Sequence, residues 1–187
     1  MKRENSFINN NYTTSQIFMK TLTKIFCASI ILLGFNAASF AQVSATATAS
    51  ATIVAPIAIA KTVDMNFGNV ASSAALGTVV MTPAGARSVI GGVTLPATIG
   101  TVAAASFTVT GTAGYTYSIT LPGGATTITS GANNMTVNSF TSTPAATGLL
   151  TGGTQALTVG ATLNVGANQV AGAYLSGTPF TVTVNYN

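Results

Sequence analysis

The sequence contains few side chains that could do acid–base, nucleophilic or metal chemistry. It has no histidine, two acidic residues (Glu4 and Asp64) and one cysteine, Cys27. A Ser-His-Asp triad requires a histidine, a glycosidase requires two neighbouring carboxylates, and a transition-metal site requires several histidine, cysteine or carboxylate ligands. We therefore predict a protein that is not an enzyme and that holds no cofactor and no metal ion.

Lys61 and Asp64 stand three residues apart near the expected end of a strand. A lysine can act as general base for a serine nucleophile, but no residue nearby in the sequence would orient Lys61 for that task. We interpret the two side chains as solvated surface charges.

Tyr115, Tyr117 and Tyr174 could form a stacking platform for a sugar. Aromatic rings suit that task, but they suit equally well a core in which each hydroxyl finds a hydrogen-bond partner. Alternation places Tyr115 and Tyr117 on the same strand face as Ile119, and this arrangement favours core packing.

The first 41 residues have the layout of an export signal. A short basic region (19–24) precedes an apolar run (25–35), and Ser39-Phe40-Ala41 is a small-x-small cleavage sequence. The apolar run is shorter than the roughly 20 residues that a transmembrane helix needs. We predict that translation starts at Met19, that cleavage follows Ala41, and that residues 42–187 are exported to the periplasm, the cell surface or the medium, with no membrane span.

The predicted mature chain is one domain of nearly neutral charge. It retains Lys61, Arg87 and Asp64 as its charged side chains, and Cys27 lies in the leader, so no disulfide can form within it. A basic patch that could neutralise phosphates is missing, which argues against nucleic acid as a partner. Because little electrostatic repulsion keeps such a domain dispersed, we expect self-association or binding to a surface partner.

The two ends of this domain have the clearest strand patterns, with period two. At the end of the chain, apolar residues alternate with polar ones after Pro179 and predict a strand that closes a sandwich: Phe180, Val182, Val184 and Tyr186. At the start, small apolar residues alternate with serine and threonine and form a possible assembly segment: Val43, Ala45, Ala47, Ala49, Ala51 and Ile53. Whether this segment pairs within its own chain or with another chain stays open. Pro56 places residues 51–60 at a sheet edge.

Further strands follow between these ends, and no stretch has the apolar spacing of a helix. We expect a hairpin of 76–81 and 87–95, with a bulge or a close backbone approach at Gly91-Gly92, and a hairpin of 105–111 and 115–121. A short strand at 135–140, an exposed loop at 141–153 and a long strand at 157–165 follow. Eight or nine such strands predict a single all-β, antiparallel, immunoglobulin-like sandwich. A membrane barrel, with strands of about 9 to 11 residues and aromatic girdles, is the less compatible alternative.

Several motifs resemble an uncharacterised family of secreted bacterial all-β domains that is similar to spore coat protein U and to chaperone-usher pilins. They are Phe67-Gly68, 107–111, 117–122, 159–163 and the ending 172–186. The resemblance implies a pilin-like sandwich whose N-terminal extension can be donated to a neighbour. The sequence departs from pilins in its missing mature cysteine and in the alanine-rich extension, which would fill acceptor pockets poorly.

These observations favour an exported structural protein, a fimbrial-like or coat-like subunit that assembles through strand edges or its N-terminal arm. The alternative is a secreted binding module or adhesin that recognises glycan or another surface through the loop 141–153 or the tyrosines.

Overall fold

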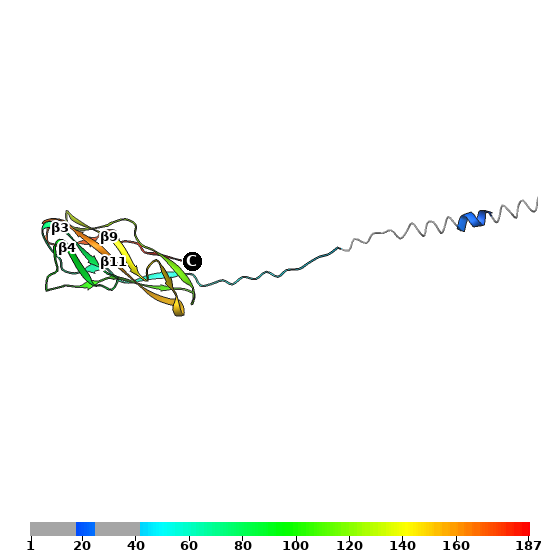
Figure 1. The fold of residues 1–187 in the computed structure, drawn as a ribbon, viewed down its shortest axis with the longest axis horizontal. Helices are drawn as coiled ribbons and strands as arrows, with labels where there is room; N and C mark the ends of the chain where they lie inside the picture. Colours follow the sequence, from blue (N-terminus) through cyan, green and yellow to red (C-terminus); the bar gives the residue numbers. More distant parts are fainter. Residues whose placement is uncertain (1–17, 25–41) are drawn as a thin grey trace, which may run out of the picture. The chain divides into compact units, whose positions relative to one another are not determined.

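The computed structural model describes residues 18–24 and 42–187, and the chain divides into two units, Met1–Ser50 and Ala51–Asn187 (Figure 1). In the first unit, residues 18–24 form an exposed helix and residues 42–50 are exposed and belong to no strand. No helix in the described ranges is both long and apolar enough to cross a membrane. The apolar part of the predicted export signal, with its cleavage sequence, lies outside the described residues.

The second unit is all-β and antiparallel, as predicted. Its described residues form thirteen strands rather than eight or nine, because three strands have only two residues and two others, β8 and β10, were not expected. The strands are β1 (Ala58–Val63), β2 (Asn66–Phe67), β3 (Ala71–Met81), β4 (Arg87–Thr94), β5 (Val102–Ala103), β6 (Ala105–Thr110), β7 (Thr116–Thr120), β8 (Thr126–Ser130), β9 (Asn133–Thr143), β10 (Thr147–Leu149), β11 (Thr154–Val165), β12 (Leu175–Ser176) and β13 (Thr183–Tyr186). A short 3₁₀ helix, Thr151–Gly153, precedes β11.

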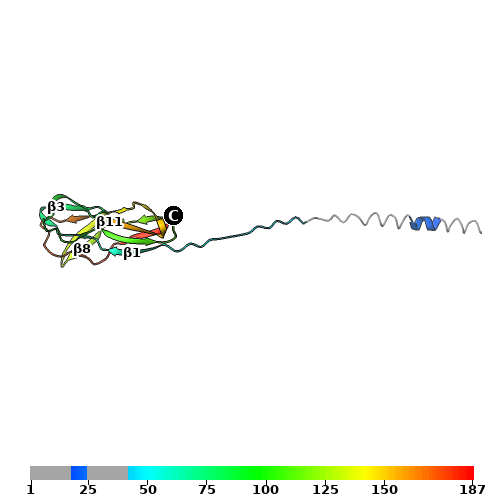
Figure 2. The ribbon, with the colours of Figure 1, turned by 90° about the horizontal axis from the view of Figure 1, so that it is seen from below.

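The long strand β11 is the centre of an eight-stranded sheet. Its residues 154–159 pair with β6 and its residues 161–165 pair with β3, while 158–164 pair with β9. The β11 residues that pair with β9 overlap those that pair with β6 and those that pair with β3. β9 therefore lies on one edge of β11, and β6 and β3 lie end to end along the other edge. Figure 1 shows β3, β4, β9 and β11 side by side. In the turned view of Figure 2, β3 and β11 lie above β1 and β8, strands of the same sheet.

A second sheet of three strands, β10-β7-β13, packs against one end of the large sheet and completes the sandwich. Fully buried Val109 and Leu157 come from the large sheet, and Tyr117 and Val184 come from the small one. The apolar faces of the large and the small sheet thus pack against each other, as alternation predicts.

The predicted hairpin of 105–111 with 115–121 is wrong. β6 pairs with β1 and β11, whereas β7 pairs with β10 and β13, so the chain crosses between the two sheets after Thr110. The reason lies in the partners of the turn: Gly111 N–H donates to the Gly153 carbonyl and Gly114 N–H donates to the Leu150 carbonyl. The N–H groups of Gly111 and Gly114 therefore bond to carbonyls that follow β10, rather than to carbonyls across a β6–β7 hairpin.

The hairpin of β3 and β4 is confirmed. Its turn is closed by the Thr82 N–H, which donates to the Ala86 carbonyl. The register shifts between Ser72 and Gly77 of β3, so the extra residues are in β3, and Gly91 and Gly92 instead allow the close approach of the β3 backbone at Ala75 and Leu76. A second group of buried side chains lies here, drawn from β2, β3, β4, β9 and β11: Phe67, Val79, Met81, Val93, Val137, Ala161, Leu163 and Val165.

Two expectations about loops and edges have different outcomes. The expected sheet edge at residues 51–60 is confirmed for 58–60, because β1 pairs with β6 alone, but residues 51–57 belong to no strand. The expectation of a loop at 141–153 is wrong, because β9 continues to Thr143, β10 pairs with β7, and Leu150 is completely buried. The expected exposure is confirmed for most of these residues, and β10 lies at the edge of the small sheet. The glycines around β10 resemble a loop in composition, yet Gly148 is buried where its missing side chain makes room for the Tyr117 ring.

Candidate assembly site at the root of the N-terminal arm

Residues 42–57, which we call the arm, form no strand. Every residue of the predicted assembly segment is exposed, including Val43 at 93% and Ile53 at 97%; the others are Ala45, Ala47, Ala49 and Ala51. No described strand pairs with them. An extended segment without a partner strand presents free N–H and C=O groups, the groups through which strands add to the edge of a sheet.

The end of the arm is held by two residues from distant parts of the chain, Thr112 and Tyr186. The Tyr186 hydroxyl donates to the Ala55 carbonyl (2.8 Å) and accepts from the Thr112 N–H (2.7 Å). The Ala55 N–H in turn donates to the Thr112 Oγ1 (2.9 Å). Both backbone polar groups of Ala55 are therefore bound, and the arm leaves the sandwich at a defined residue.

Two neighbouring residues, Gly111 and Tyr115, also shape this contact. We call the five residues together the clasp: Ala55, Gly111, Thr112, Tyr115 and Tyr186. A Cβ at Gly111 would collide with the Tyr186 hydroxyl, so only glycine lets that hydroxyl reach Thr112. The Tyr115 ring packs edge-on against the Tyr186 ring, with centroids 5.6 Å apart. After Pro56, Ile57 packs against the core between the sheets.

The predicted final strand keeps its alternation but is shorter than expected. Val182 and Val184 are buried, Phe180 and Tyr186 are half-buried, and the residues between them are exposed. Strand pairing begins only at Thr183, because Thr183 lies opposite Thr120, the last residue of β7, and β13 has no other partner among the described strands. Before that point Phe180 packs against Phe140, with ring centroids 4.9 Å apart.

The other residues that the sequence offers for chemistry lie apart from the clasp or in the core. Lys61 and Asp64 are exposed, as predicted, and they also form a salt bridge with each other (2.7 Å); such a pair contributes about 0–1 kcal/mol to stability. Tyr117 is fully buried, which confirms core packing for this residue and excludes a platform of all three tyrosines. The same prediction is wrong for Tyr115, which precedes β7 and is 44% exposed. The Tyr174 hydroxyl donates to the Val170 carbonyl (2.7 Å).

Sequence reasoning identified the arm and Tyr186, but it missed Gly111 and Thr112, and it assigned Tyr115 to the core rather than to a contact with Tyr186. The pair Gly111-Thr112 looked like an ordinary turn, and a hydrogen bond that joins residues 74 positions apart leaves no local pattern. The one usable signal was Tyr186 itself, a large polar-tipped ring in an alternating final strand.

Replacing Tyr186 with phenylalanine should loosen the root of the arm without unfolding the domain. The change removes two hydrogen bonds, each with a net contribution of about 1 kcal/mol, so protection of the Thr112 amide from hydrogen exchange should fall by roughly 5- to 30-fold. Tyr174→Phe, which removes a hydroxyl bonded to Gln169 and Val170, is the matched control. Unchanged protection at Thr112 in Tyr186→Phe, or an equal loss in both variants, would contradict the clasp.

Comparison with known proteins places the sandwich in a family. Residues 57–186 match the family described as "Domain of unknown function (DUF4402)". No curated protein and no solved structure matches the chain. The matched region starts at the end of the arm and includes Tyr186.

Proposed function

We propose that this chain, which belongs to the DUF4402 family of domains of unknown function, is an exported structural subunit that assembles with further copies through its N-terminal arm. The observation that carries the proposal is the arm itself, an alternating segment that is exposed, pairs with no described strand and is fixed at its root by the clasp. The resemblance to spore coat protein U and to pilins supports the same role.

The arm has the length and the chemistry of an added strand. Residues 43–53 extend over roughly 35 Å at about 3.3 Å per residue, and β3 and β9, with eleven residues each, have the same length. The described strands β1, β4, β10, β12 and β13 each have a single partner, so open edges are present. Alanine side chains need no deep acceptor pockets, and backbone hydrogen bonds then supply most of the affinity.

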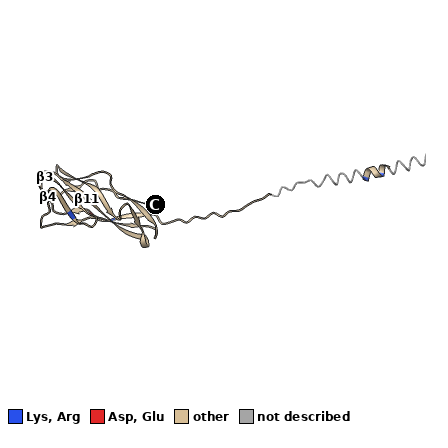
Figure 3. Ribbon diagram, viewed as in Figure 1, with Lys and Arg blue, Asp and Glu red and all other residues tan. Residues whose placement is uncertain are grey.

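Charge does not oppose association between copies. Residues 42–187 contain two basic side chains and one acidic side chain, and Figure 3 shows how few positions of the strand unit are charged. Like charges on two approaching edges are a common device against strand addition. The arm has none, so copies can approach edge to edge.

The glycan-binding alternative has less support. It relied on a loose loop at 141–153 and on three accessible tyrosines, but Leu150 and Tyr117 are both fully buried. The exposed surface that such a module would use is therefore smaller than the sequence suggested.

Deleting residues 43–53 should abolish assembly while leaving the clasp intact. The exported protein, whose N-terminus should be Gln42, is compared with the deletion variant by sedimentation velocity and electron microscopy over a range of concentrations. We expect concentration-dependent oligomers for the full arm and monomers for the deletion, because the backbone groups that pair have been removed.

A pair of double variants separates backbone pairing from side-chain contacts. Prolines at 47 and 49 remove two N–H donors, and serines at the same positions keep them. The proline variant should weaken association at least about tenfold relative to the serine variant, since that ratio corresponds to only about 1.4 kcal/mol. Monomers at high concentration with the full arm, or oligomers that survive the deletion, would defeat the proposal.

A further inference from the structure

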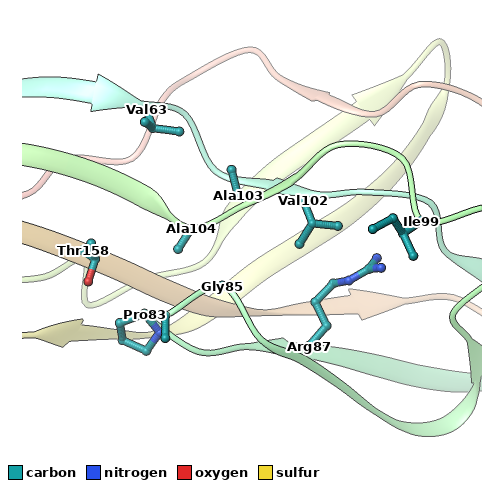
Figure 4. Close-up of a pocket in the computed structure, with 10 residues that line it drawn as sticks. Val63, Pro83, Gly85, Arg87, Ile99, Val102, Ala103, Ala104 and Thr158 are labelled. Atoms are coloured by element: carbon teal, nitrogen blue, oxygen red, sulfur yellow. The ribbon is translucent and has the colours of Figure 1, made fainter.

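A groove opens where β6 and β3 meet end to end along the same edge of β11. Its volume is about 590 Å³, within the range of about 300–1,000 Å³ that is typical of ligand sites. Figure 4 shows residues from five segments around it: the end of β1, the turn after β3, the start of β4, the β5 region and β11. Pro83, Arg87, Ile99 and Val102 are among the residues that line it.

The groove follows from the way the two strands share β11. β6 pairs with β11 as far as Val159, and β3 pairs with it from Ala161 onward. Beyond Met81 the chain turns away from β11 at Pro83, and on the other side Ala104 leads into β6. The two departing segments leave an open space, which the groove occupies.

Arg87 brings an unneutralised positive charge to this groove. Its Nη1 donates to the carbonyls of Phe67 and Asn69, the latter at 3.1 Å, which fixes the guanidinium. The donors on Nη2 and Nε have no described protein partner. Asp64, the acidic residue of the described ranges, is paired with Lys61, so no described carboxylate lies within ion-pair distance of Arg87.

Apolar side chains stand directly beside this cation. A Cβ placed on Gly68 would lie 2.6 Å from Val102 Cγ2 and 3.1 Å from Arg87 Nη1, so these two groups converge on one point. In Figure 4 the Ile99 and Val102 side chains lie near the guanidinium. Ile99 is 56% exposed and thus offers apolar surface to a ligand.

We propose that this groove binds a monocarboxylate with a linear apolar chain. A guanidinium presents parallel N–H groups that match the two oxygens of a carboxylate. A single cation balances one negative charge, whereas a phosphate dianion would keep a second charge next to apolar walls. The carboxylate binds Nη2 and Nε of Arg87, and the chain of the ligand lies along Ile99, Val102 and Pro83.

The test measures binding to the exported protein by NMR titration. The probes are butanoate, hexanoate, octanoate, 1-hexanol and inorganic phosphate. Affinity should rise from butanoate to octanoate by up to about fourfold for each CH₂ group that is buried. Hexanoate should bind at least about tenfold more tightly than hexanol, because hexanol cannot pair with the guanidinium. Phosphate that binds as well as octanoate would overturn the assignment to carboxylates.

Two substitutions of Ile99 provide a matched comparison that leaves Arg87 and its carbonyl bonds in place. Ile99→Asp places a carboxylate beside the guanidinium and should reduce octanoate affinity at least about tenfold relative to Ile99→Asn, which has the same size and no charge. Arg87→Gln should lose binding to a similar extent, and the arm deletion should not change it. Equal affinities for Ile99→Asp and Ile99→Asn, or no saturable binding of octanoate, would refute the proposal.

Discussion

Replacing Gly160 with alanine should destabilise the domain by about 3 kcal/mol or more, a large part of the 5–15 kcal/mol that typical domains possess. Gly160 is buried in β11 at the junction between β6 and β3. An added Cβ would collide with the Met81 carbonyl oxygen and would lie 2.5 Å from Thr82 C and 2.7 Å from Pro83 N.

All three of these atoms belong to the backbone, so no side-chain rotation can relieve the overlap. β3 would have to move away from β11 at the point where their pairing starts, Met81 opposite Ala161. The pairing that follows, and the buried residues that it brings together in β3 and β11, would be lost with it. The melting temperature should fall by roughly 10 °C for a domain of this size.

Gly123→Ala is the matched control for this experiment. Gly123 has no positive φ, and a Cβ placed on it would meet no atom within 4 Å. Its replacement should change the free energy of unfolding by no more than about 0.5 kcal/mol in urea denaturation. If the two alanine variants unfold at similar urea concentrations, the central role that we give to the β11 junction is wrong.

The sequence was informative where the pattern is local. Leu157, Val159, Leu163 and Val165 alternate, and each one is buried in β11, because a side-chain period of two places them on one face. The turn at Pro83 to Gly85 likewise predicted the β3–β4 hairpin, since its residues suit a tight turn and both strands lie next to it.

The pairing of strands was less predictable, because residues far away in the sequence determine which strands pair. Gly111 to Gly114 has the composition of a hairpin turn, yet the carbonyls of Leu150 and Gly153 accept its N–H groups. β10 has only three residues, of which the middle one is Gly148, and nothing nearby marks Leu150 as a core residue. A short strand of this kind is defined by β7, which it pairs with, rather than by its own composition.

In the candidate assembly site, too, the local patterns were predictable and the contacts between distant residues were not. Alternation identified the arm and the final strand separately, and the family resemblance of the sandwich is confirmed as an uncharacterised family. The connection between the two segments depends on the Tyr186 hydroxyl and on Thr112, which offers both its N–H and its Oγ1. Thr112 is 57 and 74 residues away from its partners Ala55 and Tyr186, so the contact leaves no local pattern in the sequence.

Tyr117 is the second position where one substitution should have a large effect. The ring is completely buried between the sheets, and its hydroxyl donates to Gln155 Oε1 (2.9 Å), which also accepts the Leu149 N–H (2.9 Å). Tyr117→Ala removes the largest fully buried side chain and should cost about 3–5 kcal/mol in the free energy of unfolding, measured in urea. Tyr117→Phe keeps the ring and should cost only about 1 kcal/mol, because Gln155 retains the Leu149 donor.

The pH dependence of stability tests the burial of the Tyr117 hydroxyl separately from the cavity that Tyr117→Ala would create. Burial raises the pKa of Tyr117 above its ordinary value of 10.0, because the folded core disfavours the charged phenolate. With a raised pKa, the folded state binds more protons than the unfolded state once the pH exceeds about 10. The contribution of the neutral hydroxyl is therefore complete below pH 10 and declines as the pH rises toward the folded-state pKa.

Urea unfolding at pH 8 and at pH 11 should show the sign of this effect. The stability advantage of the wild type over Tyr117→Phe should shrink or reverse at pH 11, because phenylalanine has no proton to lose. Tyr115→Phe, which changes an exposed ring two residues away and leaves Tyr117 in place, should follow the wild type at both pH values. An advantage that stays constant from pH 8 to pH 11 would mean that the Tyr117 hydroxyl is solvated in the folded domain, and the two sheets would then not enclose it as described.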